Sequence, residues 1–216
     1  MADKTERSSP TQIDVLLYIP NIIGYVRLLL LILAFLLYTN PAGFVLFYSL
    51  SILLDFFDGW TARKFNQCSA YGAWLDVIVD NVSRGCLWSN LFQWGWLIVS
   101  IEWITFVGNH QAGSKWREAH AKANPKRQIS PPEFVQKIMA NGFKTWRGAW
   151  VIAGLHILPI WIYAMKSGIT ELFLPNFISY VVAIILITGR AQCLACEMWC
   201  IQKHVKELLE EDTGNK

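Results

Sequence analysis

The chain has 216 residues, of which 54% are hydrophobic and only 16% are charged. A soluble domain carries about 25% charged residues, so this composition indicates a membrane protein. It excludes a disordered chain, a collagen and a small disulfide-stapled secreted domain. The 14% aromatic content fits a chain that crosses the membrane interface often, because indole and phenol rings favour the headgroup level. The formal charge of +3 is small, and we read no nucleic-acid partner from it.

Apolar stretches recur along the chain at the length that a membrane requires. A helix needs about 20 residues to cross ~30 Å of hydrocarbon. The predicted spans are 22–37, 43–64, 71–92, 97–107, 148–164 and 172–200. We therefore expect an all-α integral membrane protein with six transmembrane helices. Its membrane domain is predicted over 13–201, between a polar N-terminal tail at 1–12 and a charged C-terminal tail at 202–216.

The positions of Lys and Arg predict the orientation of these spans, since such residues concentrate in cytoplasmic loops. With the N-terminus inside, the cytoplasmic side holds Lys4, Arg7, Arg63, Lys64, the basic segment 115–147, Lys203, Lys206 and Lys216. The opposite side holds only Lys166. Both termini are therefore expected to be cytosolic. We interpret the basic segment mainly as part of this excess of Lys and Arg in cytoplasmic loops. The alternative is that it binds anionic headgroups. Within the segment, 132–140 is a candidate short helix.

Two neighbouring spans contain carboxylates, which are costly at membrane depth. Asp55 and Asp58 are three residues apart, and Asp76 and Asp80 are four apart, so each pair shares one helical face. The two spans are adjacent and antiparallel, and all four carboxylates can converge near the cytosolic surface. Like charges so close would repel unless cations lay between them. Oxygen ligands select Mg²⁺ or Mn²⁺, and two such ions would balance four carboxylates.

The alternative is that these aspartates form buried ion pairs. The candidate partners are Arg27, Arg63, Arg84 and Arg190. Buried pairs are an inefficient structural device, because replacing them with apolar residues is often neutral or stabilising. Gly59 and Gly72 add to the case for a binding site, since a residue without a side chain lets a ligand approach the backbone closely.

Together these residues form a recognisable motif. Asp55, Asp58, Gly59, Ala62, Arg63, Gly72, Asp76 and Asp80 resemble, without a gap, the motif of the CDP-alcohol phosphatidyltransferase family. The flanking residues 20–27, 54–55, 66–67 and 75–76 look like those of eukaryotic phosphatidylinositol synthases, and Thr145 and Arg147 fall where those proteins have a similar Thr and Arg. The likeness covers most of residues 15–200.

The resemblance implies a six-helix CDP-alcohol phosphatidyltransferase fold that transfers a phosphatidyl group from CDP-diacylglycerol to an alcohol and releases CMP. It implies that Asp55, Asp58 and Asp76 bind two Mg²⁺ or Mn²⁺ ions, and that Asp80 contacts a metal and acts as the catalytic base. Gly59, Ala62 and Gly72 would shape the cytidine site, and Arg63 would contact the substrate phosphates. Arg147, Thr145 and Arg84 are candidates for the acceptor pocket. A homodimer and an endoplasmic reticulum location also follow from the resemblance, and the Lys and Arg distribution predicts that the site faces the cytosol.

Two departures concern the acceptor. Asn81 stands where the synthases usually have Arg, although Arg84 lies one turn further on. The family's Asp- and His-rich fourth span is altered, with Glu102 and Trp103 and then no His until His110. The resemblance makes transfer to myo-inositol the leading hypothesis, and these departures motivate another alcohol as the acceptor. The alternatives are the same chemistry with glycerol phosphate or serine, and a non-catalytic paralogue that binds CDP-lipid. A transporter is disfavoured because the acids cluster at one end of the spans, not at the midplane.

Other polar residues in the spans carry weaker signals. Cys193, Cys196 and Cys200 share one helical face, and we interpret them as packed thiols more readily than as a zinc or redox site. The sequon at 81–83 lies at membrane depth on the wrong side for glycosylation. His156 lies on an apolar helix and is interpreted as an interior residue and not as a ligand.

Overall fold

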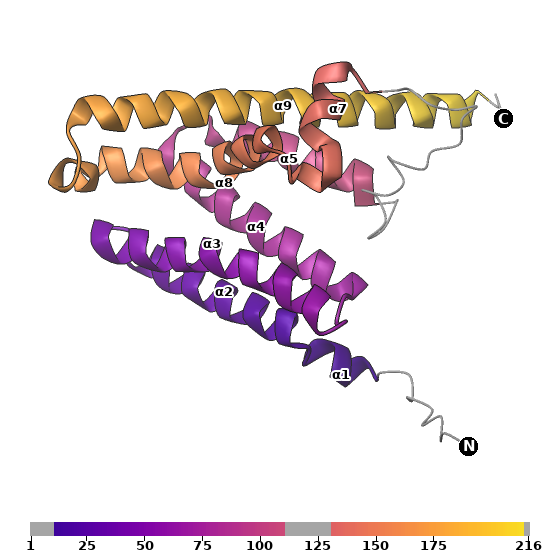
Figure 1. Ribbon diagram of the computed structural model, residues 1–216, viewed down its shortest axis with the longest axis horizontal. Coiled ribbons are helices and arrows are strands. Elements are labelled where there is room, and N and C mark those ends of the chain that lie inside the picture. The colour runs from indigo at the N-terminus through magenta and orange to yellow at the C-terminus, as the bar shows by residue number, and fades with distance from the viewer. Residues whose placement is uncertain (1–10, 111–130, 214–216) are drawn as a thin grey trace.

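Figure 1 shows the computed structural model, which describes residues 11–110 and 131–213. Every regular element in these residues is a helix, which confirms the predicted all-α class. The elements are α1 (Gln12–Leu16), α2 (Ile19–Leu36), α3 (Pro41–Lys64), α4 (Ala70–Leu91), α5 (Gly95–His110), α7 (Glu133–Met139), η2 (Ala140–Phe143), α8 (Trp146–Lys166), η3 (Ile169–Leu172) and α9 (Asn176–Asp212). Most of the predicted N-terminal tail, the first part of the basic segment 115–147 and residues 214–216 lie outside the described residues.

Short polar side chains cap the N-termini of α3, α4 and α8. Asn40, Ser69 and Thr145 each accept a hydrogen bond from the backbone N–H three residues on, at 3.2, 3.0 and 3.1 Å. Such caps satisfy N–H groups that a first helical turn leaves without partners. At α1, Thr11 and Asp14 form a reciprocal capping box, and the hydrogen bond from the Thr11 hydroxyl lowers the pKa of Asp14.

The helices agree with the predicted spans except at a few boundaries. Four of them, α2, α3, α8 and α9, are long and apolar enough to cross a membrane. α5 is a shorter apolar helix, and α4 carries charged residues along its 22-residue length. The prediction that the last span begins at 172 is wrong, because Pro175 precedes the first turn and α9 starts at Asn176. α9 then continues through Asp212, and α7 confirms the short helix predicted at 132–140.

The helices form two hairpins with α4 between them (Figure 1). α2 packs along α3, α8 packs along α9, and α4 contacts both α2 and α8. Gly154 and Gly189 allow a close approach of α8 and α9: a Cβ on Gly154 would lie 2.4 Å from the backbone nitrogen of Arg190. Small residues at such a crossing let two membrane helices meet backbone to backbone.

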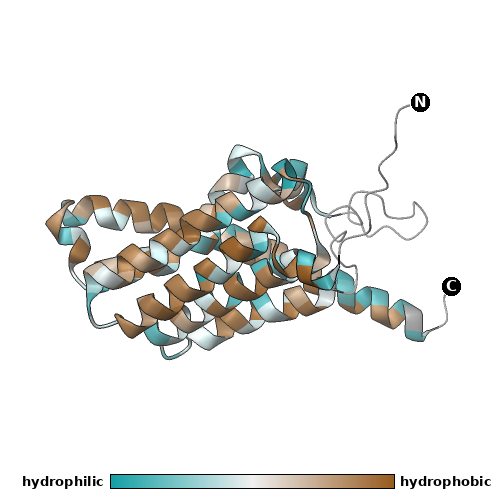
Figure 2. Ribbon diagram, turned by 90° about the horizontal axis from the view of Figure 1, so that it is seen from below, coloured by the Kyte–Doolittle hydropathy of each residue, from teal (hydrophilic) through white to brown (hydrophobic). Residues whose placement is uncertain are grey.

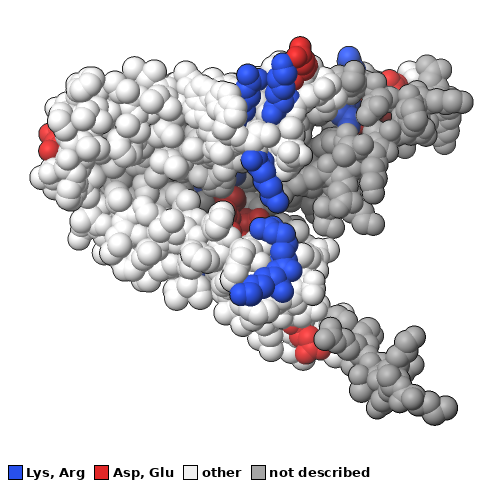
Figure 3. Space-filling model, in the orientation of Figure 1, with Lys and Arg blue, Asp and Glu red and all other residues white. Residues whose placement is uncertain are grey.

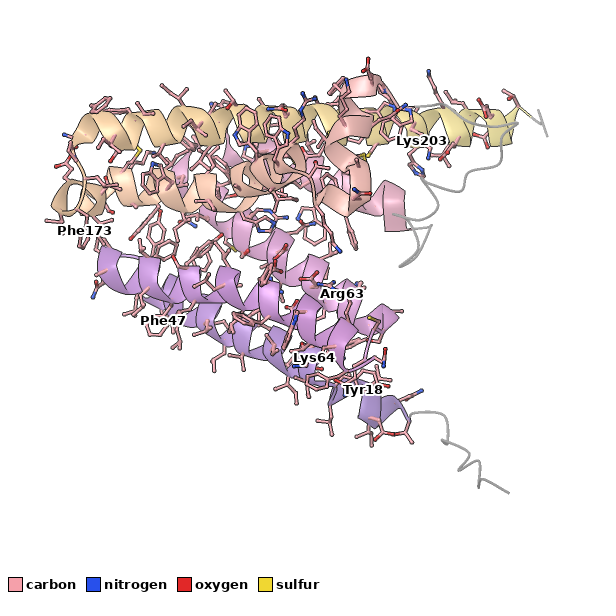
Figure 4. All side chains as sticks on the ribbon, viewed as in Figure 1. Tyr18, Phe47, Arg63, Lys64, Phe173 and Lys203 are labelled. Carbon is pink, nitrogen blue, oxygen red and sulfur yellow. The ribbon has the colours of Figure 1, made fainter. Side chains whose placement is uncertain are left out.

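Hydrophobic residues predominate along the helices (Figure 2), and many of their large apolar side chains are exposed. Leu36, Phe173 and Phe177 are each more than 70% exposed. A lipid-facing surface explains such exposure, whereas a water-soluble bundle would bury these side chains. The described chain begins and ends at the same end of the bundle, where α3 also ends in Arg63 and Lys64; Phe173 lies at the opposite end (Figures 1 and 4).

Candidate active site

The four aspartates of the motif meet between α3 and α4, around the guanidinium of Arg27 from α2. Arg27 is 1% exposed. Its terminal nitrogens lie 2.8 Å from Asp55, 2.6 Å from Asp58, 2.8 Å from Asp76 and 2.6 Å from Asp80. The helical spacing therefore brings all four carboxylates together, as expected, and the third helix supplies a cation at their centre.

The charges of this cluster do not balance. Four carboxylates face one guanidinium, which leaves three negative charges unmatched by Arg27. Carboxylate oxygens of Asp55, Asp76 and Asp80 all lie within 4.8 Å of one another, a separation that one cation can bridge. Asp58 contacts the same guanidinium but lies outside this group of three. Hard oxygen donors with surplus negative charge fit a divalent ion such as Mg²⁺ or Mn²⁺.

A cavity of about 340 Å³ opens beside the aspartates. Three helices and one connection line it: the start of α2, the end of α3, residues 67–69 and the start of α4. Gly59, Ala62 and Gly72 are among the lining residues, together with Asp58 and Asp76. The small residues predicted for the nucleotide site thus share a cavity with two of the carboxylates. Arg63 is exposed one turn beyond Gly59, with its guanidinium 3.5 Å from the position of a Cβ on that glycine.

Asn21 is a buried residue in the lining of the cavity. Its side-chain nitrogen donates to the carbonyl of Val15 at 2.5 Å, which directs the amide oxygen toward Gly72. That oxygen is buried without a hydrogen-bond partner among the described residues, and a Cβ on Gly72 would lie 2.6 Å from it. Any larger residue at position 72 would therefore collide with Asn21.

Arg84 lies beside Asp80 but is fully engaged by the protein. Its Nε donates to Glu102 at 2.9 Å, one terminal nitrogen donates to Asn81 at 2.7 Å, and the other lies 3.2 Å from Asp80 Oδ2. The side chain is only 6% exposed. Arg84 is thus placed to hold Asp80, and the residue predicted for the acceptor pocket has no nitrogen left free for a substrate.

The polar contacts continue from Glu102 on α5 to α9. Arg190 lies 3.2 Å from Glu102 and 3.0 Å from Glu197. The charges of the two glutamates balance those of Arg84 and Arg190. This buried ion-pair network is therefore neutral apart from the contact between Arg84 and Asp80. Glu102 was visible in the sequence only as a departure from the family pattern, and Glu197 carried no signal beyond being an acid in an apolar helix.

His156 on α8 is a further residue at the site that sequence reasoning did not identify. Its Nε2 lies 3.7 Å from Asp80 Oδ2, and its Nδ1 lies 3.3 Å from Arg84. Residues 80 and 156 are far apart in the chain, and no spacing rule links them. The sequence signal was only a His in an apolar span.

The other acceptor candidates lie at the start of α8. Thr145 caps this helix, and the Arg147 guanidinium lies 5.2 Å from the ring of Trp146. Neither makes a hydrogen bond or ion pair to the aspartates among the described contacts. Figure 3 shows Lys and Arg side chains in a row that flanks the recessed acidic residues.

The three cysteines of α9 are buried in the protein, as are Asn81 and Ser83 of the sequon at 81–83. Cys193, Cys196 and Cys200 are buried in an apolar cluster with Val135, Ile138, Val151 and Trp199, as packed thiols would be. Asn81 is 4% exposed and accepts a hydrogen bond from Arg84, so the sequon at 81–83 is not accessible.

Comparisons with known proteins find several relatives that share one enzyme name. The chain is 48% identical over 85 residues to CDP-diacylglycerol–inositol 3-phosphatidyltransferase 1 of Arabidopsis thaliana, covering 39% of this chain and 37% of that protein. It is 42% identical over 86 residues to CDP-diacylglycerol–inositol 3-phosphatidyltransferase of Candida albicans, covering 39% and 37%. The human protein of that name is 43% identical over 79 residues, covering 36% and 37%. Each match therefore spans well under half of the relative.

No solved structure matches the chain. The family model for CDP-alcohol phosphatidyltransferase matches residues 17–161, which include α2 to α5, the aspartates, the cavity and most of α8. With the motif, the acidic cluster and this match in agreement, the chain belongs to the CDP-alcohol phosphatidyltransferase family.

Proposed function

We propose that this protein transfers the phosphatidyl group of CDP-diacylglycerol to myo-inositol, yielding phosphatidylinositol and CMP. The observation that carries the proposal is the convergence of four aspartates beside a cavity lined by Gly59, Ala62 and Gly72. The names of the relatives support inositol as the acceptor. The phosphatidyl donor is a membrane lipid, which fits a bundle with many exposed apolar side chains.

The family is dependent on divalent metal, and the acidic cluster fits this requirement. Asp55, Asp58, Asp76 and Asp80 would hold two ions, Mg²⁺ or Mn²⁺. When bound, these ions supply charge neutralisation and polarisation of the phosphate oxygens. Asp80 accepts the proton of the attacking hydroxyl, because a hydroxyl is a poor nucleophile until a positioned base removes its proton. Gly59, Ala62 and Gly72 leave room for the cytidine, and Arg63 contacts the phosphates.

The acceptor side supports a second candidate, in which another small alcohol replaces inositol. The supporting observation is that Asn81 and Glu102, the two departures from the family pattern, both bind Arg84. Thr145 and Arg147 remain proposed acceptor contacts near the start of α8. A protein that binds CDP-lipid without turnover is the third candidate.

The arrangement in the membrane is also part of the proposal. α4, with 22 residues, extends about 33 Å and α5, with 16 residues, about 24 Å, so both are proposed to cross together with the four longer helices. Six crossings place both termini on one side, proposed to be the cytosol, with the site open to cytosolic inositol. We propose residues 13–201 as the membrane domain, an endoplasmic reticulum location and a homodimer.

Release of CMP from CDP-diacylglycerol tests the activity directly. The purified protein is assayed with Mn²⁺ or Mg²⁺ and with inositol, glycerol phosphate, serine or no acceptor. We expect release with inositol, loss of release in chelator, and loss in Asp80→Asn. Release with another alcohol alone would contradict inositol as the acceptor. Folded protein that binds CDP-diacylglycerol but releases no CMP with any of these acceptors would contradict the proposed enzymatic activity.

A further inference from the structure

His156 reaches the site from α8 and faces the carboxylate that the proposed function assigns as the base. Its side chain is 15% exposed, whereas those of Arg84 and Glu102 are 6% and 3% exposed. The histidine is therefore the more accessible of the polar groups on this side of Asp80.

The contact with Arg84 determines which imidazole nitrogen carries the proton. A guanidinium has donors and no acceptor, so Nδ1 of His156, 3.3 Å from Arg84, must accept. In the neutral ring the proton is then on Nε2. Arg84 cannot turn away, because Glu102 and Asn81 hold its other nitrogens at 2.9 and 2.7 Å. The imidazole consequently presents an Nε2–H donor toward Asp80.

The two oxygens of Asp80 face different neighbours. Oδ1 accepts from Arg27 at 2.6 Å inside the acidic cluster, while Oδ2 faces Arg84 and His156. Nε2 and Oδ2 are 3.7 Å apart, too far for a direct hydrogen bond. One hydroxyl oxygen can lie at about 2.8 Å from both atoms. The geometry thus provides one acceptor and one donor that a single alcohol group can satisfy together.

We propose that His156 binds the acceptor alcohol, its Nε2–H donating to the oxygen whose proton Asp80 Oδ2 accepts. This inference rests on the proposed function. As the proton passes to Asp80, the alcohol oxygen bonds to the phosphorus of the phosphatidyl group. The bond from that phosphorus to the oxygen of CMP breaks, and its electron pair leaves with CMP. His156 keeps its proton throughout and orients the alcohol oxygen.

Steady-state kinetics of His156→Leu and His156→Gln test the assignment. Loss of one hydrogen bond to a neutral group predicts an acceptor KM about three- to tenfold higher in His156→Leu. The KM for CDP-diacylglycerol and kcat should change little, since the bond is made in the ground state and the transition state alike. His156→Gln can place an amide N–H near the position of Nε2, and its acceptor KM should lie within about twofold of the wild type.

His204→Leu provides the matched control, because it makes the same chemical change on α9, beside Gly108. An unchanged acceptor KM in His156→Leu, or equal changes in both KM values, would overturn the role of His156 while leaving the proposed function intact. Wild-type protein that releases no CMP with any alcohol would overturn the proposed function and this inference with it. If His156→Leu does not fold, His156→Asn replaces it. The amide of Asn is shorter and cannot reach the position of Nε2, so its acceptor KM should exceed that of His156→Gln. An acceptor KM equal to that of His156→Gln would overturn the assignment.

Discussion

At the scale of single residues, Arg27 is the side chain on which the acidic cluster depends in the absence of metal. It is the shared partner of Asp55, Asp58, Asp76 and Asp80. Removing one partner of a buried ion pair costs about 3–5 kcal/mol, because the remaining charge is left without compensation. A divalent ion supplies the same kind of compensation, so Arg27 and bound metal stabilise the same carboxylates.

We predict that Arg27→Leu lowers the thermal unfolding temperature in chelator by several degrees. Added Mn²⁺ should then raise that temperature more in the variant than in the wild type, because it replaces the missing positive charge. Thermal unfolding followed by Trp fluorescence, with and without Mn²⁺, measures this difference. Arg63→Leu is the control, since Arg63 is exposed on α3. Equal Mn²⁺ shifts in wild type and Arg27→Leu would refute the prediction.

The two glycines of the cavity should respond differently to substitution. A Cβ at Gly72 would lie 2.6 Å from the Asn21 amide oxygen, whereas a Cβ at Gly59 would meet only the Arg63 guanidinium, at 3.5 Å. We expect Gly72→Ala to lower both the unfolding temperature and the rate of CMP release. Gly59→Ala should keep the unfolding temperature and reduce only CMP release, because it narrows the cavity without a collision. Equal thermal stability of the two variants would show that Asn21 can move aside.

At the scale of elements, α4 links the halves of the bundle. It carries Asp76, Asp80 and Arg84 four residues apart, and Arg84 pairs with Glu102 on α5, which in turn pairs with Arg190 on α9. The ion pairs from Arg84 through Glu102 to Arg190 tie three helices together. Because these groups are buried, each depends on its partners for the interactions that water would otherwise supply.

Glu102→Gln is therefore expected to destabilise the protein by about 3–5 kcal/mol, as it removes the charge shared by Arg84 and Arg190. Glu133→Gln provides the comparison, since Glu133 pairs with Lys137 on the exposed surface of α7 and such pairs contribute about 0–1 kcal/mol. Reversible unfolding in detergent would measure both free energies. A Glu102 variant as stable as the Glu133 variant would argue that the ion pairs of Glu102 with Arg84 and Arg190 do not stabilise the protein.

At the scale of the whole molecule, consecutive long helices alternate in direction, and the described chain begins and ends at one end of the bundle (Figure 1). Cys68 lies exposed at that end, between α3 and α4, and Phe173 lies at the opposite end (Figure 4). If the long helices cross the bilayer, these two positions lie on opposite sides of it.

Labelling by a membrane-impermeant maleimide tests this topology in sealed vesicles with the cytosolic face outward. Cys68 should react in intact vesicles. Phe173→Cys, combined with Cys68→Ser and Cys86→Ser, should react only after the vesicles are permeabilised. Reaction of both positions in intact vesicles would contradict an arrangement in which these ends face different compartments.

The sequence by itself determined the helical class, the approximate helix positions and the convergence of the aspartates, because these follow from short-range periodicity. Apolar length defined the spans, and the spacing of residues 55, 58, 76 and 80 on adjacent antiparallel helices brought the carboxylates together. The tertiary structure alone decided which distant groups surround Asp80. Arg27 and His156 reach it from α2 and α8, and Arg84 is bound by Glu102 instead of being free for a substrate. These contacts depend on how the two hairpins pack against α4, which no pattern along a single helix encodes.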